Sequence, residues 1–207
     1  MPEHRLFAAV YNAMAEGLER GGLREKRRAL LAGATGATLE LGAGTGHNLA
    51  HYPPAVERLV LTEPDPHMAK RLRARVEESG RAGVEVVEAG AEALPFGDGE
   101  LDTVTATLVF CTIPDPQAAL AEVARVLKPG GRMLFMEHVR ARSPRRARWQ
   151  ERLNPVQNAL AGGCNLNRDT AAAIRASGLT LEELRDDEMP RVAGPLVRPM
   201  IVGTARA

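Results

Sequence analysis

Apolar and polar positions follow two different periods along the first two thirds of the chain. Short runs rich in Val, Leu and Thr alternate with longer stretches in which apolar residues recur every three or four positions. The short runs predict strands and the longer stretches predict helices. Strands are expected over residues 37–41, 58–62, 84–88, 101–110 and 132–139. Because helices are expected between them, notably over 66–79 and 116–127, the pattern predicts a parallel α/β sheet with helices on its faces.

The two flanking regions follow other patterns. Residues 6–31 have helical spacing that Gly21 and Gly22 interrupt, which predicts two helices. Residues 140–163 are polar, rich in arginine and expected to be helical in part. Asn167 has the character of an N-cap for a helix that runs through Ser177. Near the C-terminus, two further strands are expected over 180–185 and 200–205, and they predict an antiparallel pair at one edge of the sheet.

Length and composition narrow the class of protein. The chain has 207 residues, which fits one domain over 1–207, with 1–32 as an N-terminal helical segment and 140–170 as a substrate-side cap. The formal net charge of +1 argues against a nucleic-acid partner, and 44% hydrophobic residues exclude bulk disorder. The sequence does not determine the oligomeric state.

Cysteine and histidine spacing adds two expectations. The two cysteines, Cys111 and Cys164, form no disulfide framework or zinc ribbon. We expect no metal site, because the spacing of four histidines matches no ligand motif; these are His4, His47, His51 and His67. No signal-peptide core is evident, and no apolar run approaches the roughly 20 residues of a membrane span, so a cytoplasmic location is expected.

A glycine loop carries the clearest chemical signal. Gly42, Gly44 and Gly46 follow the first strand of the predicted sheet, where glycine permits a sharp turn and a close approach of backbone to a ligand. Glu63 ends the next strand, 21 positions after Gly42, where a carboxylate can hold ribose hydroxyls. The third glycine comes one residue too early for a dinucleotide fingerprint, since His47 occupies the expected place. The loop therefore predicts a nucleoside-bearing cofactor without a pyrophosphate, and a short helix is expected after it.

These motifs, taken together, resemble class I S-adenosylmethionine-dependent methyltransferases. They are Glu40 with the three glycines, Glu63-Pro64, residues 90–96 and residues 127–131. The resemblance implies a Rossmann-like seven-stranded sheet whose last strand is antiparallel, and S-adenosylmethionine as cofactor. It implies these cofactor-binding residues: Tyr11, Glu40, Gly42, Ala43, Gly44, Glu63, Pro64, Met68, Ala91, Glu92, Thr107 and Leu108. One departure is Gly90, which stands where the family often has an acidic residue, so contact with the adenine is left to Ala91 or Glu92.

Segments outside the cofactor motifs resemble the alkyl thiol S-methyltransferases among the methyltransferase-like proteins. They are residues 48–54, 107–111, 135–139, 163–168 and 196–199. The vertebrate members of that family carry an N-terminal membrane anchor, which we do not expect here. The resemblance implies methyl transfer to a small-molecule thiol. Thiolates are strong nucleophiles, and a free thiol has a pKa near 8.5, so a strong base is not required.

Several roles remain open at this stage. His138, at the end of a strand, is the candidate catalytic acid or base, or else a structural histidine. Cys111 and Cys164 either line the pocket or simply pack. The arginines of 140–152 form a solvated helix face or a lid. Three other functions stay open: a C- or O-methyltransferase of the quinone-biosynthesis type, a non-catalytic cofactor-binding regulatory protein, and a nicotinamide oxidoreductase.

Overall fold

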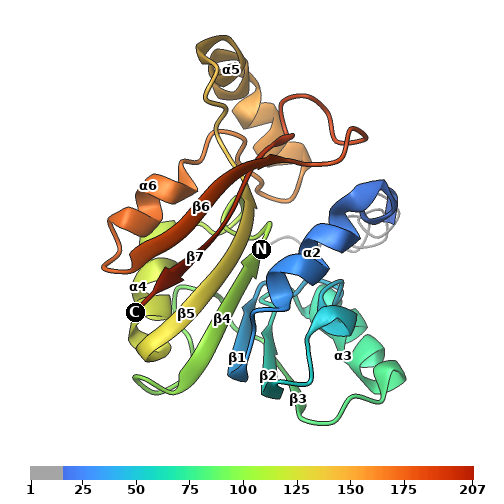
Figure 1. The fold of residues 1–207 in the computed structure, drawn as a ribbon. Helices are drawn as coiled ribbons and strands as arrows, with labels where there is room; N and C mark the ends of the chain where they lie inside the picture. The colour runs from blue at the N-terminus through green and yellow to red at the C-terminus, as the bar shows by residue number, and fades with distance from the viewer. Residues whose placement is uncertain (1–15) are drawn as a thin grey trace.

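A computed structural model describes residues 16–207, which fold around one seven-stranded sheet (Figure 1). The strand order is β3-β2-β1-β4-β5-β7-β6. The strands are β1 (Gly36–Leu41), β2 (Val56–Thr62), β3 (Val84–Val87), β4 (Leu101–Thr107), β5 (Leu127–His138), β6 (Thr180–Glu188) and β7 (Pro199–Arg206). Strand β7 pairs antiparallel with both β5 and β6, whereas the other pairs are parallel. This arrangement confirms the predicted seven-stranded, mostly parallel sheet.

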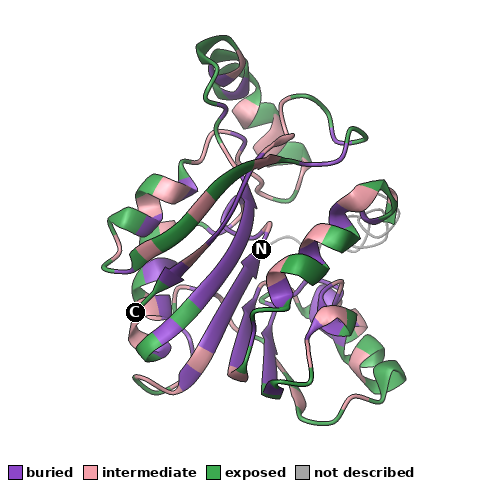
Figure 2. Cartoon of the chain, in the orientation of Figure 1, coloured by how far each residue is buried: buried purple, intermediate pink, exposed green. Residues whose placement is uncertain are grey.

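Helices cover both faces of the sheet. The helical elements are the π-helix η1 (Glu19–Leu23), α2 (Arg24–Leu31), the 3-10 helix η2 (Leu49–His51), α3 (Pro66–Ser79), α4 (Pro116–Val126), α5 (Pro144–Leu160) and α6 (Thr170–Arg175). Helices α2 and α3 lie on one face, and α4 and α6 on the other (Figure 1). Leu31 and Leu72 belong to the core of the first face, and Leu120 and Ile174 to that of the second. Strand β4 is accordingly almost wholly buried, and so is the second half of β5, from Met133 to His138 (Figure 2).

Local capping explains why two predicted helices have the expected bounds. The Asp65 side chain accepts hydrogen bonds from the backbone N–H groups of His67 and Met68, and Gly80 ends α3 with a left-handed φ of 61°. Asp115 caps α4 in the same way. The helix interruption expected at Gly21-Gly22 is also present, since Gly22 has a non-helical φ of 113° inside η1.

Several local expectations were wrong. Strand β5 begins at Leu127 rather than at residue 132, and β6 ends at Glu188 rather than at residue 185. Turns and the 3-10 helix η2 take the place of the helix expected directly after the glycine loop. Strand β4 ends at Thr107 rather than at residue 110, because Leu108 has a φ of 58° and turns the chain out of the sheet. The cap of α6 is Asp169, which accepts a hydrogen bond from the Ala172 N–H, and not Asn167.

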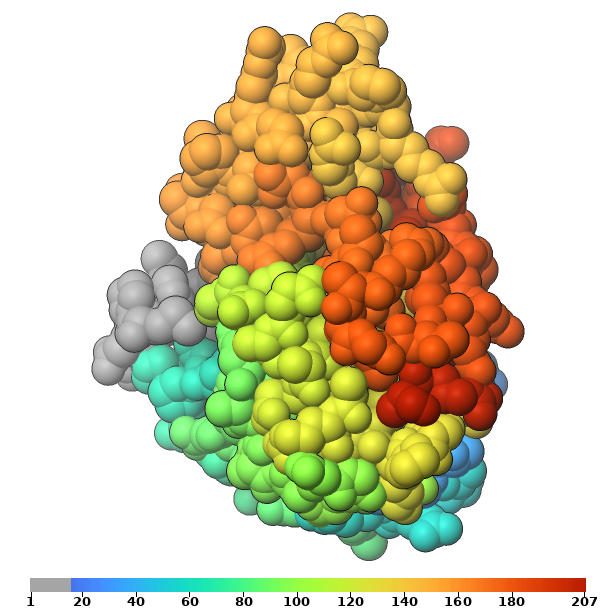
Figure 3. All heavy atoms as spheres, turned by 90° about the vertical axis from the view of Figure 1, so that its left-hand side faces the viewer, coloured from blue at the N-terminus to red at the C-terminus, as the bar shows by residue number. Residues whose placement is uncertain are grey.

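Helix α5 has an unusual distribution of side chains. Its inner face carries amides: Gln150 is fully buried, while Asn154 and Asn158 bind the loop at 163–166. Its outer face carries exposed apolar side chains, namely Trp149, Leu153, Val156 and Leu160. The segment projects at one end of the molecule (Figure 3). Some arginines of 140–152 pair with acidic neighbours: Arg142, just before α5, pairs with Asp186, and Arg146, on α5, pairs with Glu188.

Within residues 16–207, none of the helices combines the length and apolar character needed to cross a bilayer.

Candidate functional site

The glycine loop leaves the carboxyl end of β1 in a conformation that requires glycine. Gly42, Gly44 and Gly46 all have left-handed φ angles, of 56°, 60° and 84°. A Cβ atom at Gly42 would overlap Cγ2 of Val109, which belongs to the turn after β4. The Ala43 N–H donates to the Thr62 carbonyl over 2.8 Å. The loop is therefore held close to its neighbours.

Glu63 joins the end of β2 to this loop. Its Oε2 accepts a hydrogen bond from the Gly44 N–H over 2.8 Å, and its Oε1 accepts one from the Asp65 N–H over 3.0 Å. The side chain is buried, and this burial raises the pKa of the carboxyl, although the two backbone hydrogen bonds oppose the shift. Each carboxylate oxygen retains a further lone pair, so the residue can still accept from a ligand hydroxyl.

A network of buried polar side chains lies next to the glycine loop. The Glu40 carboxylate accepts hydrogen bonds from Asn48 Nδ2 (2.9 Å) and Tyr52 Oη (2.8 Å). Arg27 donates to Asn48 Oδ1 and Thr107 Oγ1, both over 2.9 Å. Burial raises the pKa of Glu40 from 4.5 to about 7, although these neighbours partly oppose the shift. The predicted residues Glu40 and Thr107 are thus parts of one network.

Sequence reasoning missed most of this network. Arg27 is itself buried and forms an ion pair with Glu19, from Nε to Oε1 over 2.8 Å. Both residues lie in the N-terminal helical elements, and Asn48 and Tyr52 follow the glycine loop. In the sequence they resemble ordinary surface residues of helices and turns. Only the fold places them around Glu40.

The other predicted cofactor residues lie along the same edge or next to it. Pro64 is exposed, whereas Met68, in the first turn of α3, is buried. Ala91 is buried within the core, and Glu92 is half-buried, with Oε1 3.4 Å from the Asp115 N–H. Leu108 turns the chain after β4, and its N–H donates to the Met136 carbonyl. Tyr11 lies outside the described residues.

A second cluster lies at the carboxyl ends of β4 and β5. His138 ends β5, and its Nε2 is 3.1 Å from Cys164 Sγ. Cys111 follows β4, and the three ligand-type atoms of Cys111, His138 and Cys164 lie within 4.8 Å of one another. Hydrogen bonds from Cys111 and His138 lower the pKa of the Cys164 thiol, whereas the same contact with Cys164, together with burial, raises the pKa of Cys111.

Glu137 lies beside this cluster and is fully buried. Its Oε1 accepts a hydrogen bond from the Val109 N–H over 2.9 Å, and burial raises its pKa to about 7. Among the described residues, neither Glu137 Oε2 nor His138 Nδ1 has a hydrogen-bond partner. Buried polar atoms without partners are rare and often mark functional sites.

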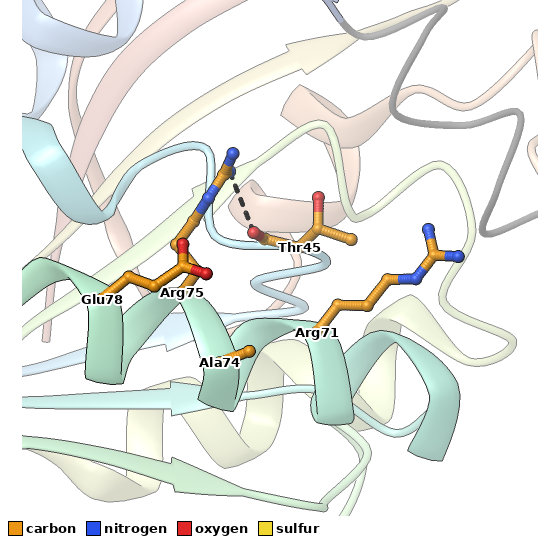
Figure 4. Close-up of a pocket in the computed structure, with 5 residues that line it drawn as sticks. All are labelled: Thr45, Arg71, Ala74, Arg75 and Glu78. Atoms are coloured by element: carbon orange, nitrogen blue, oxygen red, sulfur yellow. Dashed lines mark hydrogen bonds between the residues drawn. The ribbon is translucent and has the colours of Figure 1, made fainter.

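A hollow of about 320 Å³ opens between the glycine loop and α3 (Figure 4). It is lined by Thr45, Arg71, Ala74, Arg75 and Glu78. Two of these residues are joined, because Arg75 donates a hydrogen bond to the Thr45 carbonyl over 3.0 Å (Figure 4). None of the predicted cofactor-binding residues lines this hollow.

Comparisons with known proteins identify the family. A family model described as a methyltransferase domain matches residues 39–135. The human thiol S-methyltransferase TMT1A is 36% identical over 210 residues, which cover 96% of this chain and 82% of the human protein. The ubiquinone/menaquinone biosynthesis C-methyltransferase UbiE of Enterobacter sp. (strain 638) is 40% identical, but over only 48% of this chain and 41% of its own length.

The fold has close structural counterparts. A solved structure from Bacillus halodurans C-125, described as that of a methyltransferase, superposes with a TM-score of 0.73 at 21% sequence identity. The match covers 88% of this chain and 97% of the other. At this identity the likeness concerns the fold alone. The likeness to the human protein covers 96% of this chain and therefore includes residues beyond 135, where the family model ends. The chain therefore belongs to the methyltransferase family that includes the human thiol S-methyltransferase TMT1A.

Proposed function

We propose that this protein transfers the methyl group of S-adenosylmethionine to the sulfur of a small thiol. The observation that carries the proposal is the extent of the likeness to the human thiol S-methyltransferase, which covers 96% of the chain and thus includes the acceptor-side residues after 135. The quinone-type C-methyltransferase matches only 48% of the chain. The acceptor side, and not the cofactor side, distinguishes these two activities.

The residues at the glycine loop suit the cofactor. S-adenosylmethionine, when bound, supplies a methyl group on a positively charged sulfur. Two buried carboxyl groups, Glu40 and Glu63, lie at the loop and favour a cationic ligand when they are ionised. The left-handed glycines leave backbone free to contact the ligand, and Glu63 can accept hydrogen bonds from ribose hydroxyls.

The acceptor sulfur must be aligned with the donor methyl group, and this alignment matters more than strong acid–base catalysis. Methyl transfer from a sulfonium is an in-line displacement, so holding the acceptor in line supplies much of the rate. His138, at the carboxyl end of β5, is the proposed acid–base residue and takes up the thiol proton. The segment 140–170 is the proposed cap, and it carries Cys164 to within 3.1 Å of His138. We further propose a cytoplasmic location, which suits two free cysteines, and an acceptor that is not a nucleic acid.

An acceptor screen tests this function. The protein is incubated with S-adenosylmethionine and pairs of acceptors that differ in one atom: alkyl thiols with the corresponding alcohols, and thiophenols with phenols, alongside quinols. Mass spectrometry then detects the methylated product and S-adenosylhomocysteine. We expect thioethers from the thiols alone. Methylation of quinols or phenols with inert thiols would assign the quinone-type activity instead. Cofactor binding without any product would assign a regulatory role.

A further inference from the structure

The cluster at the ends of β4 and β5 contains a donor set that methyl transfer alone does not require. Cys111 Sγ, His138 Nε2 and Cys164 Sγ lie within 4.8 Å of one another. In a tetrahedral zinc site, zinc–ligand bonds of about 2.0–2.3 Å place neighbouring ligand atoms roughly 3.5–3.8 Å apart. The 3.1 Å separation of His138 Nε2 and Cys164 Sγ is close to that spacing. Shifts of about an ångström or less would bring all three atoms around one ion.

The surrounding chain holds these ligands in place from two sides. The Asn165 backbone N–H and its side-chain Nδ2 both donate to the Cys111 carbonyl, over 2.8 and 3.0 Å. Asn158 Nδ2 donates to the Gly163 carbonyl over 2.8 Å from α5. The Cys164 loop is thus fastened to the turn that carries Cys111. Such supporting contacts are what orients the ligands of a metal site.

Burial and polarity favour a bound ion over a packing role. Cys111 and His138 are each only 3% exposed, and Cys164 is half-buried, so the set has one accessible side. Beside the set lies Glu137, whose buried Oε2 has no hydrogen-bond partner among the described residues. Two sulfurs and an imidazole are the ligands that zinc prefers, and this Cys₂His set leaves a fourth position open.

We propose that Cys111, His138 and Cys164 bind a zinc ion whose open fourth position takes the sulfur of the acceptor thiol. This inference rests on the proposed function. It departs from the expectation of no metal site, which considered only the spacing of His4, His47, His51 and His67. The three ligands are far apart in the sequence and meet only at the ends of two strands and in the loop after α5.

The chemistry balances without an oxidant. The acceptor R–SH binds zinc through sulfur and releases its proton to solvent, because the ion lowers the thiol pKa. The thiolate sulfur then forms a bond to the methyl carbon, and the bond between that carbon and the donor sulfur breaks, with its electron pair going to the donor sulfur. The product thioether is neutral and a weaker zinc ligand, so it can leave. With zinc bound, the ion takes over the acidification of the thiol, and His138 serves as its ligand.

Spectroscopy on cobalt-loaded protein tests the site without turnover. Reduced, chelator-treated protein is titrated with Co²⁺. We expect one ion per chain, sulfur-to-cobalt charge-transfer absorption and the intense visible bands of a four-coordinate site. The variants Cys164→Ser and His138→Asn should lose most of this signal, and His67→Gln should retain it. Absence of uptake by the wild type, or a signal unchanged in a Cys111→Ser/Cys164→Ser double variant, would overturn the proposal.

Wild-type measurements keep the test valid if a variant fails to fold. Zinc should protect both cysteines from alkylation, and X-ray absorption should find two sulfur neighbours and at least one nitrogen. An intramolecular Cys111–Cys164 disulfide that persists under reducing conditions would contradict the proposal. An alkanethiol should change the cobalt spectrum, whereas the matching alcohol should not.

Turnover separates this proposal from the proposed function. If zinc-free protein methylates thiols as fast as zinc-loaded protein, the role of the ion is refuted and thiol methylation stands. If zinc binds as described and no thiol is ever methylated, the proposed function fails and the metal site stands.

Discussion

The Glu63 carboxylate accepts a hydrogen bond from the backbone N–H of Gly44 over 2.8 Å, so the end of β2 holds the loop that follows β1. Glu63 consequently has two tasks: it fixes the loop, and it offers its remaining lone pairs to a ligand. Removal of its side chain affects both tasks at once.

Glu63→Ala should weaken S-adenosylmethionine binding by about 10- to 100-fold. This loss of affinity corresponds to one hydrogen bond to a charged group, which contributes about 1.5–3 kcal/mol. Isothermal titration calorimetry measures the dissociation constant. Glu57→Ala is the matched control, because Glu57 is an exposed glutamate on the same strand. An equal affinity of the two variants would refute the role of Glu63.

Gly42→Ala should destabilise the protein by about 2–4 kcal/mol. Part of the cost is the left-handed φ of 56°, and part is the overlap of the new Cβ with Val109 Cγ2. Urea unfolding gives the free energy. Combining the change with Val109→Ala removes the overlap but not the backbone strain. The double variant should therefore lose less stability than the two single changes added together; strict additivity would show that the predicted overlap does not occur.

Glu40 should make stability depend on pH. Its folded-state pKa, about 7, is above its usual value of 4.5, so the folded protein binds the proton more tightly than the unfolded chain. The resulting stabilisation is complete below about pH 4.5 and is lost as the pH rises through 7. Its size is on the order of 3 kcal/mol. Arg27, Tyr52, Asn48 and Glu63 are the neighbours that act on this carboxyl.

Glu40→Gln isolates this contribution. The variant keeps the shape of the side chain and removes its titration, so its stability should fall less than that of the wild type between pH 5 and pH 8. Thermal or urea unfolding at several pH values supplies the comparison. Glu137 also has a raised pKa and titrates in both proteins, so only the difference between them reports on Glu40. Parallel pH profiles would contradict the assignment.

Arg27→Met should cost about 3–5 kcal/mol of stability, because it leaves the buried Glu19 carboxylate without its cation and Asn48 without a donor. Arg28 is the next residue on α2, is exposed, and provides the control: Arg28→Met should change stability by no more than about 0.5 kcal/mol. A double variant with Glu19→Leu should recover part of the loss, since it removes both charges. Equal effects of the Arg27 and Arg28 changes would show that the network carries no energy.

Local signals were sufficient to predict most of the fold. Helix α3 was predicted with its exact bounds because Asp65 and Gly80 define its ends within the sequence itself. The glycine loop and Glu63 were found because their spacing along the chain reflects the geometry of two adjacent parallel strands.

Predictions failed where distant residues decide the structure. Strand β4 ends because the backbone of Leu108 has a positive φ, and a leucine side chain gives no sign of this conformation in the sequence. Arg27 is buried only because Asn48 and Thr107 arrive from other elements to receive its hydrogen bonds. Cys111 and Cys164 are 53 positions apart, and no local pattern connects them. Such contacts follow from topology, not from periodicity.

Helix α5 has one more consequence. It is attached through amides, as Gln150 accepts a hydrogen bond from the Ala141 N–H and donates to the Val139 and Leu196 carbonyls. Its large apolar side chains are exposed, and only the small Ala147 is buried. Detachment of α5 would expose little new apolar surface, so it carries a small heat-capacity change and a weak dependence on denaturant. We therefore expect α5 to detach as a separate cooperative unit while the sheet stays folded, whereas the Cys164 loop keeps its hydrogen bonds to the Cys111 carbonyl. The stability of α5 and the global stability of the sheet are thus expected to be two separate properties of this chain.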